Sequence, residues 1–147
     1  MEGKCCRWWK KRSAVSLQQS AIHRIIGKGY RRDQLKVWEK AHRLTLAVYK
    51  ATNNFPIDEK YGLTNQIRRS SVSIPSNIAE GCGRNGEAEL ARFLLIGMGS
   101  ASELEYQILL AHDLTFLNEQ GHAKLNSKIT EVKRMLTSLI QKLKADS

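Results

Sequence analysis

The sequence predicts an all-α protein, an antiparallel up-down four-helix bundle with a kinked second helix. Three observations support this fold class. Apolar residues recur in alternating steps of three and four along three separate segments, as they do on one face of a helix. No segment reads as a strand, and the loops between the predicted helices are short, which favours antiparallel neighbours. The chain of 147 residues, 41% of them hydrophobic, is long enough to bury a core.

The first and the fourth predicted helices each carry one continuous apolar row. The first covers about residues 33–55, with Asp33 as its expected N-cap and Pro56 as its stop. Its row is Val37, Ala41, Leu44, Val48, Ala51 and Phe55. The fourth covers about residues 119–144, and its row is Leu125, Ile129, Val132, Leu136, Leu139 and Leu143.

The second predicted helix, about residues 59–82, contains a proline in its middle. A proline inside a helix removes one backbone hydrogen bond and clashes with the preceding turn, which costs about 3 kcal/mol. We therefore expect a kinked helix that is stabilised by closely packed neighbours. Its apolar residues are Leu63, Ile67, Ile74 and Ile78, and the small residues that allow close packing are Ser70, Ser71, Ser73 and Ser76.

The third predicted helix, about residues 86–115, is the most apolar of the four. Its row is Leu90, Leu94, Gly97, Ala101, Leu104, Ile108 and Ala111. The other faces of its first half are also apolar, and a helix that is apolar all round needs more neighbours than a small bundle supplies. The pattern therefore predicts self-association. A patch of small residues is expected to face the proline helix, and its members are Gly97, Gly99, Ser100, Ala101 and Ser102.

The positive charge is concentrated at the N-terminus. Residues 1–32 carry a net charge of +8, which leaves +2 of the total of +10 for residues 33–147. We therefore divide the chain into a basic tail, residues 1–30, disordered or partly helical, and a bundle, residues 31–147. In the tail, Trp8 and Trp9 lie among basic residues, a combination that suits phosphate attraction and base stacking. The alternative interpretation is an extension without a specific role.

Targeting and redox features favour a cytoplasmic protein. No apolar stretch follows the basic N-terminus as in a secretory signal, and the longest nearly apolar run, 93–99, is too short to cross a bilayer. The cysteines are Cys5, Cys6 and Cys82, an odd number without the spacing of a disulfide framework.

The sequence predicts neither catalysis nor a cofactor. The four histidines are dispersed, and the spacings typical of zinc and di-iron sites are missing. The segment 81–86 matches the letters G-x-G-x-x-G, but a predicted helix rather than a strand precedes it. We expect these glycines to end one helix, with Asn85 capping the next.

Several polar residues lie near the apolar rows, and two interpretations of them remain open. The first is a structural polar network that fixes helix register, made of Gln66, Asn77, Glu80, Glu103 and Gln107. The second is that nearby arginines project outward to bind phosphates, since a guanidinium binds carboxylate or phosphate in two places at once. The candidate nucleic-acid contacts are then Arg7, Trp8, Trp9, Lys10, Lys11, Arg12, Arg68, Arg69, Arg84 and Arg92.

Four blocks in the same order, 35–42, 62–69, 73–81 and 99–105, make the chain resemble a family of four-helix bundles. The family comprises the 23S rRNA intervening-sequence proteins and is related to the accessory variability determinants of diversity-generating retroelements. The resemblance implies a homopentameric barrel. It also implies a non-catalytic protein that holds structured RNA or an RNA–DNA hybrid as a partner of a reverse transcriptase. The alternatives are a protein associated with an rRNA intervening sequence, or a structural scaffold that binds other proteins and no nucleic acid.

Overall fold

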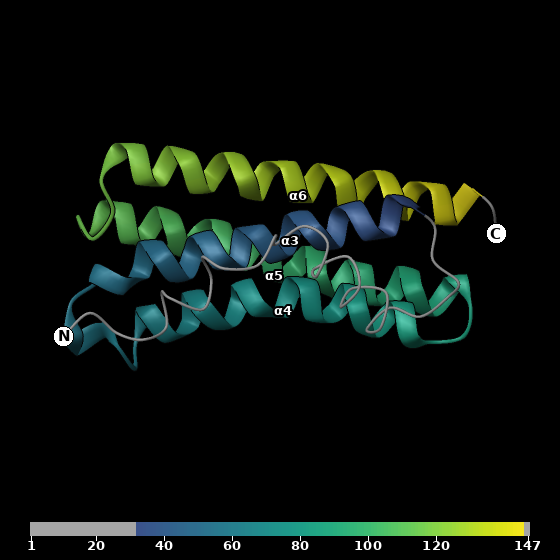
Figure 1. Cartoon of the computed structure of the whole chain (residues 1–147), viewed down its shortest axis with the longest axis horizontal. Helices are drawn as coiled ribbons and strands as arrows, with labels where there is room; N and C mark the ends of the chain where they lie inside the picture. The colour runs from purple at the N-terminus through teal and green to yellow at the C-terminus, as the bar shows by residue number, and fades with distance from the viewer. Residues whose placement is uncertain (1–31, 146–147) are drawn as a thin grey trace, which may run out of the picture.

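The computed structural model describes residues 32–145, which form an up-down bundle of four long helices without a strand (Figure 1). The helices are α3 (Arg32–Ala51), α4 (Leu63–Gly83), α5 (Glu87–Asp113) and α6 (Glu119–Ala145). Two short 3-10 turns, η1 (Thr52–Asn54) and η2 (Ile57–Glu59), join α3 to α4. In Figure 1 successive helices run in opposite directions. Helix α3 packs against α4 and α6, and α5 also packs against α4 and α6. The predicted fold class is confirmed.

The apolar rows form the core of this bundle. All seven predicted positions of α5 and all six of α6 are buried, as are the first four of α3. In α4, Ile67, Ile74 and Ile78 are fully buried. The rows meet because each helix buries the face on which its apolar residues recur, and this burial is the main source of stability.

Helix α4 continues through Pro75, which is buried. Of the predicted small-residue patch of α5, Gly97 and Ser100 face α4, whereas Gly99 and Ser102 are exposed. The hydroxyl oxygens of Ser73 and Ser100 lie 2.9 Å apart, and a Cβ atom at Gly97 would lie 3.6 Å from the carbonyl oxygen of Ile74. The closest approach is elsewhere, at Gly81, where a Cβ atom would lie 2.7 Å from the Cβ of Phe93.

The helix ends differ from the predictions at three places. Helix α3 already includes Arg32, so Asp33 lies inside the helix and not at its N-cap. Helix α4 begins at Leu63 because the preceding residues form the separate turn η2. The N-cap of α5 is Gly86 and not Asn85, and no side chain caps this end. Gly86 has φ of 105°, a backbone conformation that glycine adopts without steric cost.

Candidate nucleic-acid interface

Helix α3 presents different chemistry to its two neighbours. Toward α4 it carries Trp38, His42 and Tyr49, which line surface hollows together with residues of α4. Toward α6 it carries cations, of which Lys40 pairs with Glu131 of α6 at 2.6 Å. The two sides follow from the helical repeat, because residues three and four apart share a face.

A shallow hollow at the start of α4 brings cations and aromatic rings together. We call it the tyrosine–arginine hollow, and its lining residues are Tyr49, Lys60, Tyr61, Asn65, Arg68, Arg69, Val72 and Ser73. These come from α3, from the loop after η2 and from α4, elements that are brought together by the turn between α3 and α4. Aromatic faces beside cations are the groups that bind single-stranded nucleic acid without reading its sequence.

The guanidinium group of Arg68 is held in place within the tyrosine–arginine hollow. Its Nε donates a hydrogen bond of 2.9 Å to Oγ1 of Thr52, and its central carbon lies 4.9 Å from the ring centroid of Tyr49. Neither partner is a carboxylate, so the positive charge of Arg68 is not neutralised by these contacts. An arginine positioned in this way retains terminal N–H groups that suit a phosphate.

Two further cations and an exposed ring complete the tyrosine–arginine hollow. Arg69 is exposed and makes no ion pair with another described residue. The ammonium of Lys60 lies 5.4 Å from the ring centroid of Tyr61, and the Tyr61 side chain is 84% exposed. A large ring that is exposed to this extent offers a face on which a base can stack.

An apolar groove, which we call the α3–α4 groove, continues from this hollow along the two helices. Its lining residues are Trp38, His42, Thr45, Leu46, Tyr49, Val72, Pro75, Ser76 and Ala79, of which Tyr49 and Val72 also line the hollow. The rings of Trp38 and His42 stack with centroids 5.1 Å apart. Burial lowers the pKa of His42 below its ordinary value of 6.5, because the charged imidazolium loses hydration there.

The four predicted arginines of the bundle do not form one surface. Arg84 is the C-cap residue of α4, sixteen residues after Arg68, a separation that corresponds to about 24 Å along the helix. Arg84 pairs with Glu80 at 2.7 Å and Arg92 with Glu89 at 3.6 Å, and both guanidinium groups lie over the ring of Phe93. These two arginines therefore belong to a separate cluster that already contains carboxylates.

The predicted tail contacts lie outside the described residues. They are Arg7, Trp8, Trp9, Lys10, Lys11 and Arg12, and they stay a prediction. Sequence reasoning missed Lys60, Tyr61 and Asn65 as members of a site. The connection between α3 and α4 could have identified them. In two antiparallel helices joined by a short turn, residues at similar distances from the turn face each other.

The predicted polar network is not formed as one unit within the chain. Gln107 is buried and its side-chain amide donates to Oε1 of Glu103 at 3.0 Å, one turn earlier on α5. Asn77 donates to Ser73, which in turn contacts Ser100. Gln66, Glu80 and Glu103 are exposed, so these three members of the predicted network are not buried between the helices of the single chain. They lie on outward parts of their helices, where Glu103 accepts from Gln107 and Glu80 pairs with Arg84.

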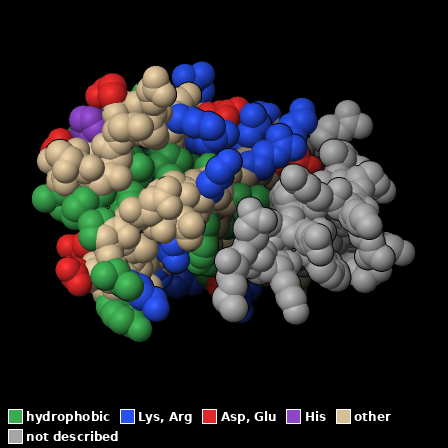
Figure 2. Space-filling model, turned by 60° about the vertical axis from the view of Figure 1, so that its left-hand side comes forward, with side chains coloured by type: hydrophobic (Ala, Val, Ile, Leu, Met, Phe, Trp, Pro, Cys, Tyr) green, Lys and Arg blue, Asp and Glu red, His purple; other side chains and the backbone are tan. Residues whose placement is uncertain are grey.

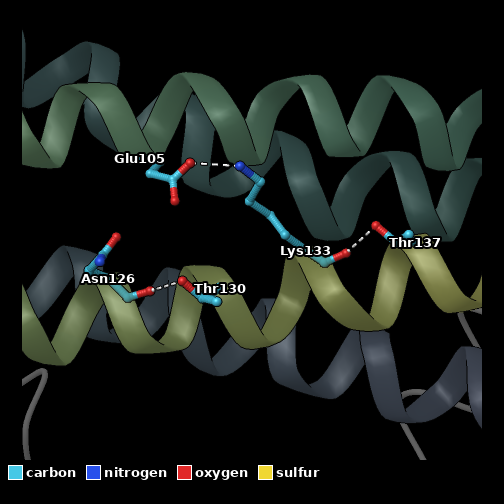
Figure 3. A network of polar contacts seen from close by, with 5 residues as sticks. All are labelled: Glu105, Asn126, Thr130, Lys133 and Thr137. Atoms are coloured by element: carbon cyan, nitrogen blue, oxygen red, sulfur yellow. Dashed lines mark hydrogen bonds and ion pairs between the residues drawn. The ribbon is translucent and has the colours of Figure 1, made fainter.

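The charges of the bundle are separated by helix. Helix α5 carries Arg92 against five acidic residues, which are Glu87, Glu89, Glu103, Glu105 and Asp113. Helix α6 carries six cations against two glutamates. Figure 3 shows Lys133 of α6 reaching to Glu105 of α5, with 2.6 Å between Nζ and Oε2. Figure 2 shows several Lys and Arg side chains on the upper part of the visible face, on the side where α6 lies, and others lower on the same face.

Other kinds of site are not found in the part of the chain that the structure describes. Within residues 32–145, no three His, Cys, Asp or Glu side chains are grouped as a metal site, and no helix is long and apolar enough to span a membrane. Gly81 and Gly83 lie inside α4, so the G-x-G-x-x-G letters do not form a dinucleotide turn. Burial raises the pKa of the Cys82 thiol to about 11, which leaves it unreactive at neutral pH.

The fold and its helix order define the class of the protein as an antiparallel four-helix bundle. The model of the 23S rRNA-intervening sequence protein family matches residues 33–138, and the chain belongs to this family. A crystal structure from Bacteroides thetaiotaomicron, of a protein with unknown function from the S23 ribosomal protein family, is similar with a TM-score of 0.69. The two sequences are 24% identical, and the match covers 74% of this chain and 98% of that chain. A likeness at this level of identity shows the fold alone. The comparison with curated proteins gives no match.

Proposed function

We propose that this protein is a non-catalytic RNA-binding protein whose tyrosine–arginine hollow binds unpaired nucleotides of a structured RNA. The observation that carries the proposal is the convergence of three cations and two tyrosines in one hollow. Phosphates are attracted by Lys60, Arg68 and Arg69, while a base stacks on the exposed ring of Tyr61.

The family context supports an RNA ligand. The family is named for intervening sequences of 23S rRNA, and this name favours an association with such an RNA over a role beside a reverse transcriptase in a retroelement. The reverse-transcriptase partnership and the RNA–DNA hybrid stay predictions from the resemblance. Binding through the hollow requires neither, since stacking and phosphate contacts are available to any single-stranded segment.

The experiment is a titration of a fluorescent single-stranded RNA and of an RNA hairpin with an unpaired loop, at low and at raised salt. We expect binding to both at low salt and a linear fall of log K with log salt. Tyr61→Ala removes a stacking ring, and a stacked base contributes about 1–3 kcal/mol, so affinity is expected to fall by about fivefold or more. Arg69→Gln is expected to weaken binding and to flatten the salt dependence.

The matched control is Arg84→Gln, which removes the same charge at the C-cap of α4, outside the hollow. We expect it to keep most of the affinity. Absence of binding by the unaltered protein at low salt overturns the proposal and favours the scaffold alternative. Equal losses for Arg69→Gln and Arg84→Gln also contradict it, because they indicate attraction by net charge alone.

We further propose that the chain self-associates through the outer face of α5. Exposed apolar side chains are concentrated there, namely Leu95, Ile96, Tyr106 and Leu109. The second apolar surface of the chain is the α3–α4 groove, on other helices. A contact between two different surfaces of identical chains is heterologous and closes into a ring when the rotation permits. The number of five subunits comes from the family resemblance.

A further inference from the structure

A second surface, formed by α3 and α6, has a different composition from the tyrosine–arginine hollow. We call it the α3–α6 face. Its cations on α3 are Lys36, Lys40, Arg43 and Lys50, and those on α6 are Lys124, Lys128 and Lys142. The steps within each set are three, four, seven or fourteen residues, so each set forms one row along its helix.

The two rows lie side by side because α3 and α6 are antiparallel neighbours. Lys40 contacts Glu131 near the middle of the face. Toward one end, Lys36 and Lys142 line the same shallow depression with Met135 and Ser138. The α3 row spans about 21 Å and the α6 row about 27 Å, at 1.5 Å per residue. The helix axes in such packing are about 8–10 Å apart.

The composition of the α3–α6 face is that of a phosphate-binding surface without a stacking ring. Two acidic residues lie along the rows, Glu39 on α3 and Glu131 on α6, and neither row contains an aromatic residue. The aromatic residues of α3 are Trp38 and Tyr49, and both line hollows on the opposite side, toward α4. Lys133 is directed away from this face, toward Glu105 of α5.

Such a surface suits a double helix better than a single strand. In a duplex the bases are stacked within the helix, and the protein contacts regularly placed phosphates by charge and shape. In a single strand the bases are exposed and are held by aromatic rings, which this face lacks. A lipid surface is a poorer fit, because interfacial helices insert an apolar face beside their cations.

The geometry points to the α3–α6 face as a binding surface for the double-helical stem of an RNA. This inference rests on the proposed function, since the stem belongs to the RNA whose unpaired nucleotides occupy the tyrosine–arginine hollow. The two surfaces lie on different sides of α3 and come closest at its C-terminal end, where Tyr49 lines the hollow and the next residue, Lys50, ends the cation row. One RNA with a stem and an unpaired segment therefore contacts both surfaces.

The test compares three RNAs, a blunt duplex, a single strand of the same length, and a hairpin. The variant Lys36→Gln/Arg43→Gln/Lys128→Gln removes three cations from the α3–α6 face. We expect its affinity for the duplex to fall by more than about tenfold at 0.1 M salt, and the slope of log K against log salt to decrease by about 2–3. Its affinity for the single strand should change far less.

The matched control, Arg84→Gln/Arg92→Gln/Lys144→Gln, changes the net charge equally outside both surfaces. It should keep most of the duplex affinity, and Tyr61→Ala should weaken single-strand binding while sparing the duplex. Thermal unfolding of each variant shows that it is folded. The inference is overturned if the two triple variants lose duplex affinity equally. It is also overturned if the variant of the α3–α6 face no longer self-associates but binds RNA as well as the unaltered protein does.

The three RNAs also separate the two proposals. An unaltered protein that binds the single strand and not the duplex contradicts the α3–α6 inference and leaves the hollow standing. A protein that binds the duplex and not the single strand contradicts the hollow as the site of unpaired nucleotides. Absence of binding to all three contradicts both.

Discussion

The hydroxyl of Thr45 on α3 donates a hydrogen bond of 2.8 Å to the backbone carbonyl oxygen of Ser71 on α4. In a regular helix this carbonyl would accept a hydrogen bond from the N–H of residue 75, which is a proline and has none. Both Thr45 and Ser71 are buried, so no water is available to take that place. The side chain of α3 thus satisfies the carbonyl that Pro75 leaves without a partner.

Thr45→Val keeps the shape of the side chain and removes its hydroxyl, so the carbonyl of Ser71 becomes buried without a donor. We expect the free energy of unfolding to decrease by about 1–3 kcal/mol. Chemical denaturation checks this value. The control Thr137→Val also removes a helix hydroxyl, one that bonds only the carbonyl of Lys133 on its own exposed helix face, and should change stability little.

Pro75→Ala tests the same relationship from the other side. Alanine restores an N–H at position 75, so the carbonyl of Ser71 no longer depends on Thr45. Thr45→Val should therefore cost less in the Pro75→Ala background than in the native chain, and a double-mutant cycle measures the difference. Equal costs in both backgrounds would contradict the assigned role. Pro75→Ala should have a larger effect on stability or assembly than on RNA affinity.

The glycines of the α4–α5 contact are predicted to differ in their tolerance of a methyl group. An alanine at Gly81 forces Phe93 to move, because the new Cβ would lie 2.7 Å from its Cβ, and we expect a loss of about 1–3 kcal/mol. At Gly97 the new Cβ makes ordinary contacts at 3.6 and 3.7 Å. Gly97→Ala should therefore be neutral or stabilise by up to about 1 kcal/mol. Denaturation midpoints of the two variants check the ranking.

His42 should make the bundle less stable in mild acid. Its pKa in the folded protein lies below 6.5 because it is buried, so the unfolded chain binds the proton more tightly. The free energy of unfolding then falls as the pH drops below about 6.5 and stops falling once the pH is below the folded-state pKa. His42→Gln should flatten this part of the stability profile. If the free energy of unfolding depends on pH equally in the variant and in the native chain, His42 does not make this contribution.

The apolar rows were predictable because burial follows the helical period. Val37, Leu94 and Leu136 are in the core for that reason, and the order of the helices follows from short loops. The proline marked a carbonyl in need of a partner, but its donor, Thr45, lies 26 residues away from Ser71. Only the rotation of α3 against α4 brings the two together. The sequence pattern pointed to the small-residue patch of α5 for close packing against α4, whereas the tightest contact between the two helices is at Gly81, beside Phe93.

The candidate sites were less predictable than the core. Arg68 and Arg69 were identified from their residue type, but their neighbours Lys60 and Tyr61 precede α4 and join them only through the turn. The acidic residues are concentrated on α5 and the basic residues on α6. The near-neutral net charge of residues 33–147 did not reveal this separation, because a net charge does not say where the charges lie. Knowing which side of each helix faces which neighbour reveals the cation rows, and that requires the packed structure.

The exposed apolar face of α5 leads to a prediction about assembly. Leu95 is 50% exposed in the single chain, and Leu109 is exposed on the same side of the helix about four turns later. If a second copy of the chain covers this face, Leu95→Glu places a charge in an apolar contact and should shift the protein toward monomers. Sedimentation velocity at several concentrations measures the shift. The control Gln141→Glu adds the same charge on the exposed side of α6 and should leave the assembly intact. Identical sedimentation of Leu95→Glu and the native protein would show that α5 is not the contact surface.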